Sequence, residues 1–440
     1  MARHCYILCL ELQQKEISLF QVRLPYGRTE IPLILSRKPL VLQPRQSSQV
    51  QSEELELRRA IRSPIQSRGL SEIACRGDKV AIIINDVTRP IPTDKILPML
   101  LRELDYSNIP REDVTIIVAT GVHRACSKSE LCAMVGNDVV DKIRIENHDC
   151  KKADGLAHVG KTRRGVPVVI NKTVAEADVK IVTGMVSPHH VAGYSGGRKS
   201  IMPGIAGLDA IRVHHSGKFR PIGPAMGILE GNMFHEEAEE AASITGIDFI
   251  VNVVLNNQRQ LVKAVAGDWK EAWKTAVNAS EGLFRVDIAG QADIVITSPG
   301  GYPRDIDLWQ AQKAMSSAEM IVREGGTIVL VAECADGFGG HNFGRFFEGT
   351  TSPRDVIDAF NKRGYEPGLS KAFMYARALE KAEIIVVTKK ISDAELAKVY
   401  TKRSDSLKQA LEMAKVRLGS SAQVAVLPHA TEVVPRVVKK

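Results

Sequence analysis

Short runs of β-branched and other apolar residues recur along the chain, and amphipathic stretches and polar loops separate them. The run KVAIIIN at residues 79–85 has almost no polar face, which is typical of a parallel strand that is covered on both sides. Runs that we expect to be strands of such sheets lie at residues 79–85, 114–119, 178–183, 249–255, 293–297, 327–331, 384–388 and 423–427. Because helical stretches separate the runs, the pattern predicts an α/β fold with mostly parallel sheets.

The same pattern divides the chain. It restarts after a boundary near residues 275–290, so we expect an N-terminal α/β domain at 1–280 and a C-terminal α/β domain at 281–440. Ahead of the first long run, residues 17–22 and 31–35 predict short strands. A six-residue apolar stretch near the start of the chain is too short for a signal peptide or a membrane span, and we expect it to form the first strand.

Two helices have recognisable starts. Residues 93–104 follow the first of the long runs and offer Thr93 and Asp94 as candidate caps. Ser127 and Glu130 have the spacing of a capping box, which predicts that a second helix begins there.

Composition narrows the classes of partner. The 440 residues include 44% hydrophobic and 25% charged residues, as in a soluble globular protein with a substantial core. The net charge of +8 is spread without a dense basic run, and aromatic residues make up only 5%, so an anionic small molecule is favoured over nucleic acid. Seven cysteines, odd in number and without C-x-x-C spacing, favour reduced thiols in the cytoplasm over a disulfide framework or a zinc cluster.

The segment HHVAGYSGGRKSIMPGIAGLDAIRVHH at 189–215 combines a glycine-rich loop, two cations and flanking histidines. Glycines let backbone N–H groups close on an anion. The residues that we expect to bind a cofactor here are Ser195, Gly196, Gly197, Arg198 and Lys199. A Walker A loop has glycine immediately before its lysine, whereas this loop has arginine there. An ordinary P-loop nucleoside triphosphatase is therefore not predicted. The plain alternative is a glycine-rich turn with solvated basic side chains.

Polar residues gather where four predicted strands end. The ends are residues 86–90, 120–124, 184–189 and 298–302, and the last of these leads into a helix with the sequence WQAQK at 309–313. Open α/β sheets bind ligands beyond the carboxyl ends of their strands. Four such ends in two domains predict an active site in the cleft between the domains.

Histidines are the candidate acids and bases. His123 and His189 each follow a strand, and a pair of imidazoles on opposite faces of a substrate can take and return a proton near neutral pH. Either one alone would be interpreted as a hydrogen-bonded loop residue. His214 and His215 are neighbours and diverge on a helix, so we expect at most one of them to bind a metal. His235 begins an HEE sequence without a second histidine, and we expect a solvated helix face there.

Cations near the strand ends suggest a carboxylate substrate. Arg89 offers a bidentate contact and Lys313 a point charge, while Gln310 lies one helical turn before Lys313 and shares its face. For a single Arg or Lys the alternative is ordinary surface charge. We expect Asp86 to orient Arg89 or a hydroxyl of the cofactor, and we group it with Thr88 among the cofactor-binding residues.

Five short motifs follow one another along the chain: DVTRP at 86–90, GVHR at 121–124, HHVAGYSGGRK at 189–199, PGIAG at 203–207 and WQAQK at 309–313. In order and spacing, across roughly residues 23–430, they resemble the nickel-pincer-nucleotide-dependent lactate racemase family. The resemblance implies a two-domain α/β fold with its active site between the domains. It covers essentially the whole chain except the first 20 or so residues.

The resemblance also implies a cofactor. It is a pyridinium nucleotide that carries sulfur groups and is joined covalently to Lys199. Its nickel is held by two sulfurs, a ring carbon and His215. Enzymes that build the cofactor would be needed for maturation, and neither a nucleic acid nor a membrane is implied as a partner.

For the reaction, the resemblance implies inversion at C2 of a 2-hydroxy acid, either lactate or a larger analogue. The nickel–carbon unit accepts a hydride, and the resulting 2-keto acid takes it back on its other face. His123 and His189 remove and return the hydroxyl proton. The residues implied to contact the substrate are Arg89, Trp309, Gln310 and Lys313.

Two alternatives stay open. One is a 2-hydroxy acid oxidoreductase that uses the same hydride acceptor but releases the keto acid. The other, from a different class, is a carrier that binds the cofactor or nickel without turnover.

Overall fold

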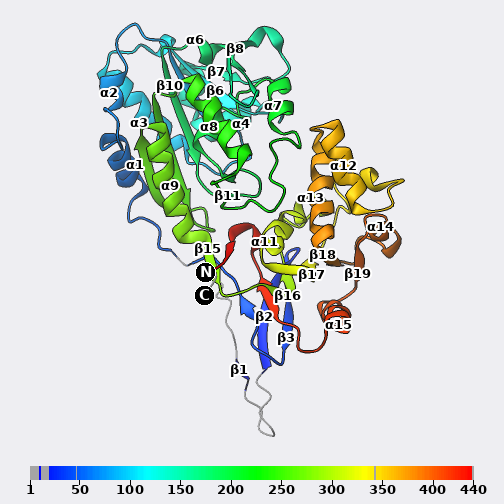
Figure 1. Ribbon diagram of the computed structural model, residues 1–440. Coiled ribbons are helices and arrows are strands. Elements are labelled where there is room, and N and C mark those ends of the chain that lie inside the picture. Colours follow the sequence, from blue (N-terminus) through cyan, green and yellow to red (C-terminus); the bar gives the residue numbers. More distant parts are fainter. Residues whose placement is uncertain (1–8, 11–18, 46, 341–342, 439–440) are drawn as a thin grey trace. The chain divides into compact units, whose positions relative to one another are not determined.

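The structure is a computed structural model that describes residues 9–10, 19–45, 47–340 and 343–438 (Figure 1). Contacts divide the chain into two compact units. The 46–283 unit comprises Gln46–Pro221 and Gly227–Leu283, and the 284–440 unit comprises Phe284–Lys440 with Met1–Arg45 and Ile222–Met226. Each unit contains a six-stranded sheet whose strands are mostly parallel, so the predicted α/β fold with two domains is confirmed.

The sheet of the 46–283 unit has the strand order β14-β13-β10-β5-β6-β7. Its strands are β5 (Val80–Asn85), β6 (Val114–Ala119), β7 (Arg144–Asn147), β10 (Val179–Met185), β13 (Phe249–Leu255) and β14 (Leu261–Gly267). Neighbours run parallel except β13 and β14. The four strands predicted here are found within one or two residues. The edge strands β7 and β14 were not predicted, because β7 is short with no buried residue and Lys263 interrupts the apolar run of β14.

One face of this sheet is covered by helices. They are α1 (Glu53–Arg62), α2 (Leu70–Ile73), α3 (Thr93–Tyr106), α4 (Lys128–Val135) and α5 (Asn137–Lys142). Ile82, Ile116 and Ile181 of the three central strands pack in this core. Ile83, one residue further, points to the opposite face and is equally buried, which is why the run has no polar side.

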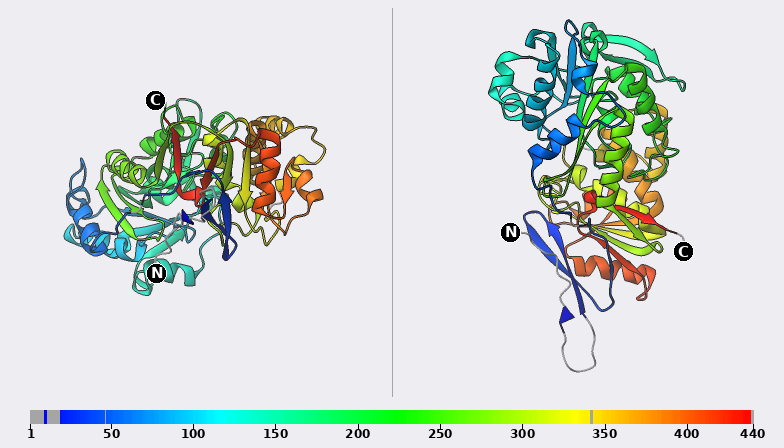
Figure 2. Two further views of the ribbon diagram at one scale, coloured as in Figure 1. Left: turned by 90° about the horizontal axis from the view of Figure 1, so that it is seen from below. Right: turned by 90° about the vertical axis from the view of Figure 1, so that its left-hand side faces the viewer.

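The sheet of the 284–440 unit has the order β19-β18-β17-β16-β20-β4, and all its neighbours are parallel. Its strands are β4 (Leu40–Val41), β16 (Ala292–Thr297), β17 (Val322–Val331), β18 (Ala382–Val387), β19 (Lys402–Ser404) and β20 (Val424–Leu427). The hairpin of β2 (Leu19–Tyr26) and β3 (Thr29–Leu35) lies beside α15 (Leu407–Leu418), and both cover one face of this sheet (Figure 2).

The predicted first domain, residues 1–280, therefore differs from the structure at its start. The β2–β3 hairpin buries Val22 and Leu33 against the sheet of the 284–440 unit, and β4 pairs with β20 at Leu40 and Ala425. A hairpin with one apolar face must cover a sheet, but its sequence does not say which sheet. The late boundary lies at residues 283 and 284, close to the predicted position. Most of the stretch expected to be the first strand lies outside the described residues, apart from β1 (Cys9–Leu10).

Of the two predicted helix starts, the structure confirms one capping prediction and contradicts the other. The capping box at α4 is confirmed, since Ser127 Oγ accepts a hydrogen bond from the Glu130 N–H at 3.3 Å and the Ser127 N–H donates to Glu130 Oε2 at 2.8 Å. The caps predicted for α3 are wrong. Pro92 is its N-cap, and Thr93 and Asp94 lie in the first turn. There Asp94 still faces the positive end of the helix.

The expectations about membrane spans and about reduced cysteines can be compared with the described residues. Within the described residues, no helix is long and apolar enough to cross a membrane. Among the cysteines whose side chains are described, the free thiols are Cys75, Cys126, Cys132, Cys150 and Cys334.

The order of the strands positions the candidate site. β10, β5 and β6 are adjacent and parallel, so their carboxyl ends meet at one edge of the sheet. The chain leaves that edge at residues 86–90, 120–124 and 186–200, which carry most of the predicted site residues.

Candidate active site

The glycine-rich loop leaves β10 and forms two short strands and a 3-10 turn before α7 (Leu208–His214). Gly196 and Gly197 adopt positive φ angles of 76° and 51°. A Cβ at Gly196 would lie 2.6 Å from Asn252 Oδ1, and one at Gly197 would lie 2.8 Å from Trp273 Cδ1. The loop therefore needs glycine at both positions, for conformation and for space.

Ser195 ties this loop to the end of β10. Its Oγ donates to the Met185 carbonyl at 2.7 Å and accepts from the Ser187 N–H at 2.9 Å. The hydroxyl predicted to contact a cofactor thus already shapes the backbone of the loop.

Lys199 lies at the end of the loop that begins at His189. Its side chain keeps partial solvent contact, and its Nζ lies 3.3 Å from His189 Nε2. Burial, followed by the charges of Arg89, Arg198 and Arg220, holds the pKa of Lys199 well below that of an ordinary lysine. A pKa shifted in this direction makes the amine a better nucleophile than that of an ordinary lysine.

His189 is held by the backbone of the loop that follows it. Its Nδ1 accepts hydrogen bonds from the N–H groups of Val191 at 3.2 Å and Ala192 at 3.1 Å. An accepting Nδ1 carries no proton, so this hydrogen-bond network assigns the proton of the neutral ring to Nε2, the atom that faces Lys199. Burial lowers the pKa of His189 well below its usual value, and the charge of Lys199 lowers it further.

His123 is held by a carboxylate instead. Its Nδ1 lies 2.6 Å from Asp86 Oδ2, and Asp86 Oδ1 accepts from the Thr88 hydroxyl at 2.5 Å. Burial raises the pKa of Asp86, but the bonds from His123 and Thr88 outweigh it, so the net pKa is lowered. A carboxylate can only accept, so Nδ1 of His123 carries the proton and Nε2 has the lone pair.

Hydrogen bonds also assign the tautomers of the neighbouring residues His214 and His215. His214 Nε2 lies 2.8 Å from the Phe234 carbonyl and donates to it, so its Nδ1 is an acceptor. His215 Nδ1 lies 3.1 Å from the Ile211 carbonyl and 3.2 Å from His214 Nδ1, and therefore carries the proton. This leaves the lone pair of His215 on Nε2. Both nitrogens of His214 are used in hydrogen bonds within the fold, so His214 is a poor candidate for a metal ligand.

Arg198 differs from the expectation. It is fully buried, and its three guanidinium nitrogens donate to two loop carbonyls and to His235 Nδ1. The guanidinium therefore holds the loop rather than contacting a cofactor directly. Arg89, in contrast, is exposed and lies close enough to lower the pKa of both His189 and Lys199.

His235 is the functional-site neighbour that the sequence interpretation missed. The HEE sequence is not a solvated face, because His235 is 7% exposed and Glu237 is fully buried. Glu237 accepts from the Thr162 hydroxyl at 2.5 Å and from Arg164 at 3.0 Å. A signal was present, since Phe234, Ala238, Ala241 and Thr245 recur at helical spacing on the buried side of α8 (Met233–Thr245).

The 284–440 unit supplies the WQAQK segment. Asp307 caps α10 (Leu308–Ala311) by accepting the Gln310 N–H at 2.6 Å. Lys313, at the start of α11 (Lys313–Ile321), donates to Gln310 Oε1 at 2.6 Å, so the two share a face as predicted. Lys371 Nζ lies 5.4 Å from the centre of the Trp309 ring.

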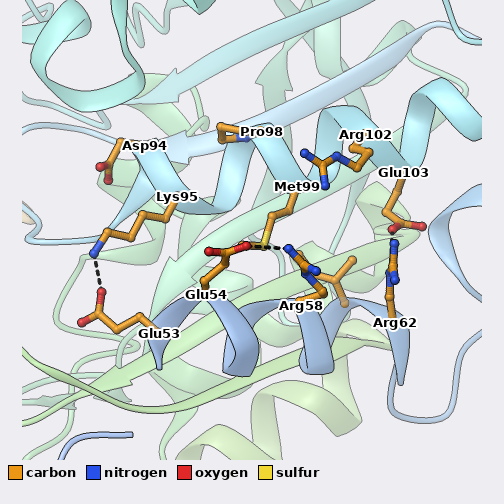
Figure 3. A pocket seen from close by; sticks show the side chains of 11 residues that line it. Glu53, Glu54, Arg58, Arg62, Asp94, Lys95, Pro98, Met99, Arg102 and Glu103 are labelled. Atoms are coloured by element: carbon orange, nitrogen blue, oxygen red, sulfur yellow. Dashed lines mark hydrogen bonds and ion pairs between the residues drawn. The ribbon is translucent and has the colours of Figure 1, made fainter. Parts of the chain in front are cut away.

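A separate groove lies between α1 and α3, with a volume of about 490 Å³ (Figure 3). Charged residues from the two helices pair across it or along it, as Glu53 does with Lys95 and Glu103 with Arg62. None of the predicted site residues lines it, and its charges balance one another.

Within the described residues, no three His, Cys, Asp or Glu side chains converge as a metal cluster. A metal with one protein ligand, as the resemblance implies for His215, would not form such a cluster.

Comparisons with known proteins cover both units. The lactate racemase N-terminal domain family matches residues 26–224, and the lactate racemase C-terminal domain family matches residues 288–435. The lactate racemase of Thermoanaerobacterium thermosaccharolyticum is 33% identical over 94% of this chain and 99% of its own length. The lactate racemase of Lactiplantibacillus plantarum is 35% identical over 87% of this chain and 91% of its own length.

Solved structures agree with these matches. The lactate racemase apoprotein from T. thermosaccharolyticum superposes with a TM-score of 0.85, covering 94% of this chain and all of that one. A Thermotoga maritima protein of 17% identity has a TM-score of 0.60 over 88% of this chain and 98% of its own, and supports the fold alone.

Proposed function

The chain belongs to the lactate racemase family and is an enzyme of the racemase class, and we propose that it inverts C2 of a 2-hydroxy acid. The substrate is lactate or a larger analogue, and the reaction passes through the corresponding 2-keto acid. The observation that carries the proposal is Lys199, whose amine lies 3.3 Å from an imidazole and whose pKa is lowered by burial and by the charges of three arginines.

The residues around Lys199 fit the nickel-pincer nucleotide. A neutral amine can be joined covalently to the cofactor, and the positive charges of Arg89, Arg198 and Arg220 suit an anionic nucleotide. His215 offers the Nε2 lone pair to nickel. When bound, this cofactor supplies an electron-deficient acceptor for the C2 hydrogen as hydride, chemistry that no side chain provides. Loading depends on the enzymes that build the cofactor.

His123 is the proton acceptor that is ready in the unmodified chain. Its Nε2 lone pair can take the hydroxyl proton of the substrate, and Asp86 stabilises the imidazolium that results. Thr88 holds Asp86 in place for this role. Asp86 is thus assigned to His123 rather than to Arg89 or to a cofactor hydroxyl.

His189 is the second acid–base residue, and it needs a preparatory movement. Its protonation at both nitrogens would set an N–H of the ring against the N–H groups of Val191 and Ala192. The ring must therefore turn away from these amides before it carries a proton to or from the substrate.

The substrate carboxylate is assigned to Arg89 and Lys313. Arg89 offers two parallel N–H donors, and Lys313 adds a charge whose direction is set by its bond to Gln310. Gln310 and Trp309 lie beside the substrate in this assignment.

The test uses protein loaded by co-expression with the cofactor-building enzymes. Starting from either pure enantiomer of lactate, chiral chromatography should show an approach to equal amounts of both, without net pyruvate. Net pyruvate from one enantiomer would replace the proposal with the oxidoreductase. If lactate and a panel of larger 2-hydroxy acids all stay unchanged on a loaded protein, the carrier would be the correct interpretation.

A further inference from the structure

Arg198 lies behind the loop that runs from His189 to Lys199. Its Nη2 donates to the Ala192 carbonyl at 2.8 Å and its Nη1 to the Gly196 carbonyl at 3.3 Å. Since both bonds reach back into the loop, the guanidinium links the two ends of the glycine-rich turn. Among the described residues, none of the ion pairs involves Arg198.

The remaining contacts of Arg198 are with neutral groups, while the charge of Glu239 acts on the guanidinium without an ion pair or hydrogen bond between these two described residues. Its Nε donates to His235 Nδ1 at 2.9 Å, and its guanidinium carbon lies 4.0 Å from the centre of the Trp273 ring. An imidazole nitrogen and an aromatic face hold the guanidinium without cancelling its charge. That charge contributes to the lowered pKa of Lys199. A carboxylate in the place of His235 would remove this effect.

His235 is fixed as an acceptor by its surroundings. Burial, and then the charge of Arg198, lowers the pKa of His235 to about 3, so the ring stays neutral. Asn232, the N-cap of α8, accepts the His235 N–H through Oδ1 at 3.3 Å and donates to the Val191 carbonyl at 2.8 Å. The start of α8 is therefore bonded to the same loop as Arg198.

Trp273 completes the support from α9 (Trp269–Phe284). Its Nε1 donates to the Ser195 carbonyl at 2.9 Å, and its ring fills the space that a side chain at Gly197 would need. The carbonyls of residues 191, 192, 195 and 196 are thus all bound from behind. The N–H groups of residues 191 and 192 bond to His189.

We propose that His235 and Trp273 are positioning residues for Lys199. By holding Arg198 they fix the backbone between His189 and Lys199, and they keep near the amine a positive charge that forms no ion pair with a described carboxylate. The reactivity of the amine follows from the loop itself; only the identity of what Lys199 finally carries rests on the proposed function.

The test measures the amine in the chain without cofactor. Lys199 is acetylated with acetic anhydride over a series of pH values, located by peptide mass spectrometry and normalised to the exposed Lys142. Wild-type protein and H235N should share one pH midpoint, because Asn Oδ1 can replace the accepting Nδ1. H235F and W273F should move the midpoint upward, H235F by about one pH unit or more, as the loop loosens and water reaches the amine.

Two controls separate positioning from loss of stability. A242G weakens α8 at a buried position without touching Arg198 and should leave the midpoint unchanged. Thermal melting of every variant reports whether it is folded. An unchanged midpoint in H235F, an equal shift in H235N, or an equal shift in A242G would each overturn the proposal.

A second readout separates this inference from the proposed function. In loaded protein, H235F should carry less adduct at Lys199 and show a lower kcat per loaded chain with KM unchanged, since Arg89 and Lys313 are not altered. A wild-type chain that never carries an adduct, yet shows the H235F shift in acetylation, would contradict the proposed function and support the positioning role. Full loading and wild-type kcat in H235F would contradict the positioning role alone.

Discussion

His123 and His189 follow neighbouring regions of the same sheet edge, yet the structure holds them in opposite ways. His123 is half exposed and bonds through Nδ1 to a carboxylate, so its Nε2 has the lone pair. His189 bonds through Nδ1 to two backbone amides, so its Nε2 carries the proton and faces Lys199. In the proposed reaction, two residues that the sequence treats as an equivalent pair therefore differ: His123 is ready to accept a proton, and His189 must first turn.

The difference lies in the partner of Nδ1. A carboxylate fixes the imidazole tautomer and stabilises its cation, whereas amide N–H groups fix the opposite tautomer and disfavour the cation. Inversion in both directions needs both residues to take and give a proton. We therefore assign the mobile step of the proposed cycle to the loop of His189 rather than to His123.

The largest expected effect comes from removing either imidazole. H123A and H189A, each loaded with cofactor, should lose inversion by on the order of 10²–10⁴-fold, since each removes one acid–base partner. Chiral chromatography of the lactate product measures the loss, and intact mass checks that loading is equal. In the chain without cofactor, H189A but not H123A should also change the acetylation of Lys199, because His189 Nε2 lies 3.3 Å from its amine. Inversion at the wild-type rate in both variants would contradict the acid–base assignment.

The next largest effect should come from substituting Asp86, which holds His123 but not His189. D86N should lower kcat by on the order of 10²-fold, because an amide can donate to Nδ1 and so place the ring proton on Nε2. Steady-state kinetics of the loaded protein is the measurement. D113N, whose carboxylate pairs with Lys79 at the opposite end of the sheet, is the matched control and should retain activity. If D86N and D113N behave alike, Asp86 does not set the tautomer of His123.

This contrast can be predicted from the sequence only in part. The apolar runs predicted the central strands, and their order placed residues 86–90 and 120–124 at one edge. The tautomers could not be predicted, because they depend on which backbone atom faces Nδ1 after the loop has folded. His235 and Trp273 were missed for a related reason: they contact Arg198 from 37 and 75 residues further along the chain, and no local sequence pattern predicts such contacts. The position of the β2–β3 hairpin likewise depends on which sheet face is left uncovered.

The pH dependence of the free energy of unfolding should distinguish His189 from the Asp86–His123 pair, with a smaller effect. His189 has a lowered pKa when folded and an ordinary one when unfolded, so below about pH 6.5 unfolding takes up a proton. The stability it contributes is present above that pH and is lost on acidification, by up to about 1.4 kcal/mol per pH unit. H189N keeps an acceptor for the two amides but does not titrate, so its unfolding free energy should fall less steeply.

Urea unfolding at several pH values between about 5 and 7 measures this slope. The lowered pKa of Asp86 acts in a separate window, because that carboxylate takes up a proton on unfolding only below about pH 4. D86N should therefore leave the slope between pH 5 and 7 unchanged. Equal slopes in H189N and wild-type protein would mean that His189 is not held neutral in the fold.

The smallest effect should come from T88V, which removes the hydroxyl bonded to Asp86. One hydrogen bond to a carboxylate is worth about 1.5–3 kcal/mol when buried and less when partly exposed, so a several-fold loss of kcat is expected. T88S keeps the hydroxyl and should restore the rate. A loss in T88S as large as in T88V would assign the effect to packing of the methyl group.

The central claim is that Lys199 carries the cofactor, and one measurement tests it most directly. After co-expression with the cofactor-building enzymes, intact mass and peptide mapping should find a nucleotide-sized adduct on Lys199, and elemental analysis should find about one nickel per chain. K199A should have neither. An unmodified mass without nickel, in a host that loads a known lactate racemase, would contradict the account and favour a binding protein.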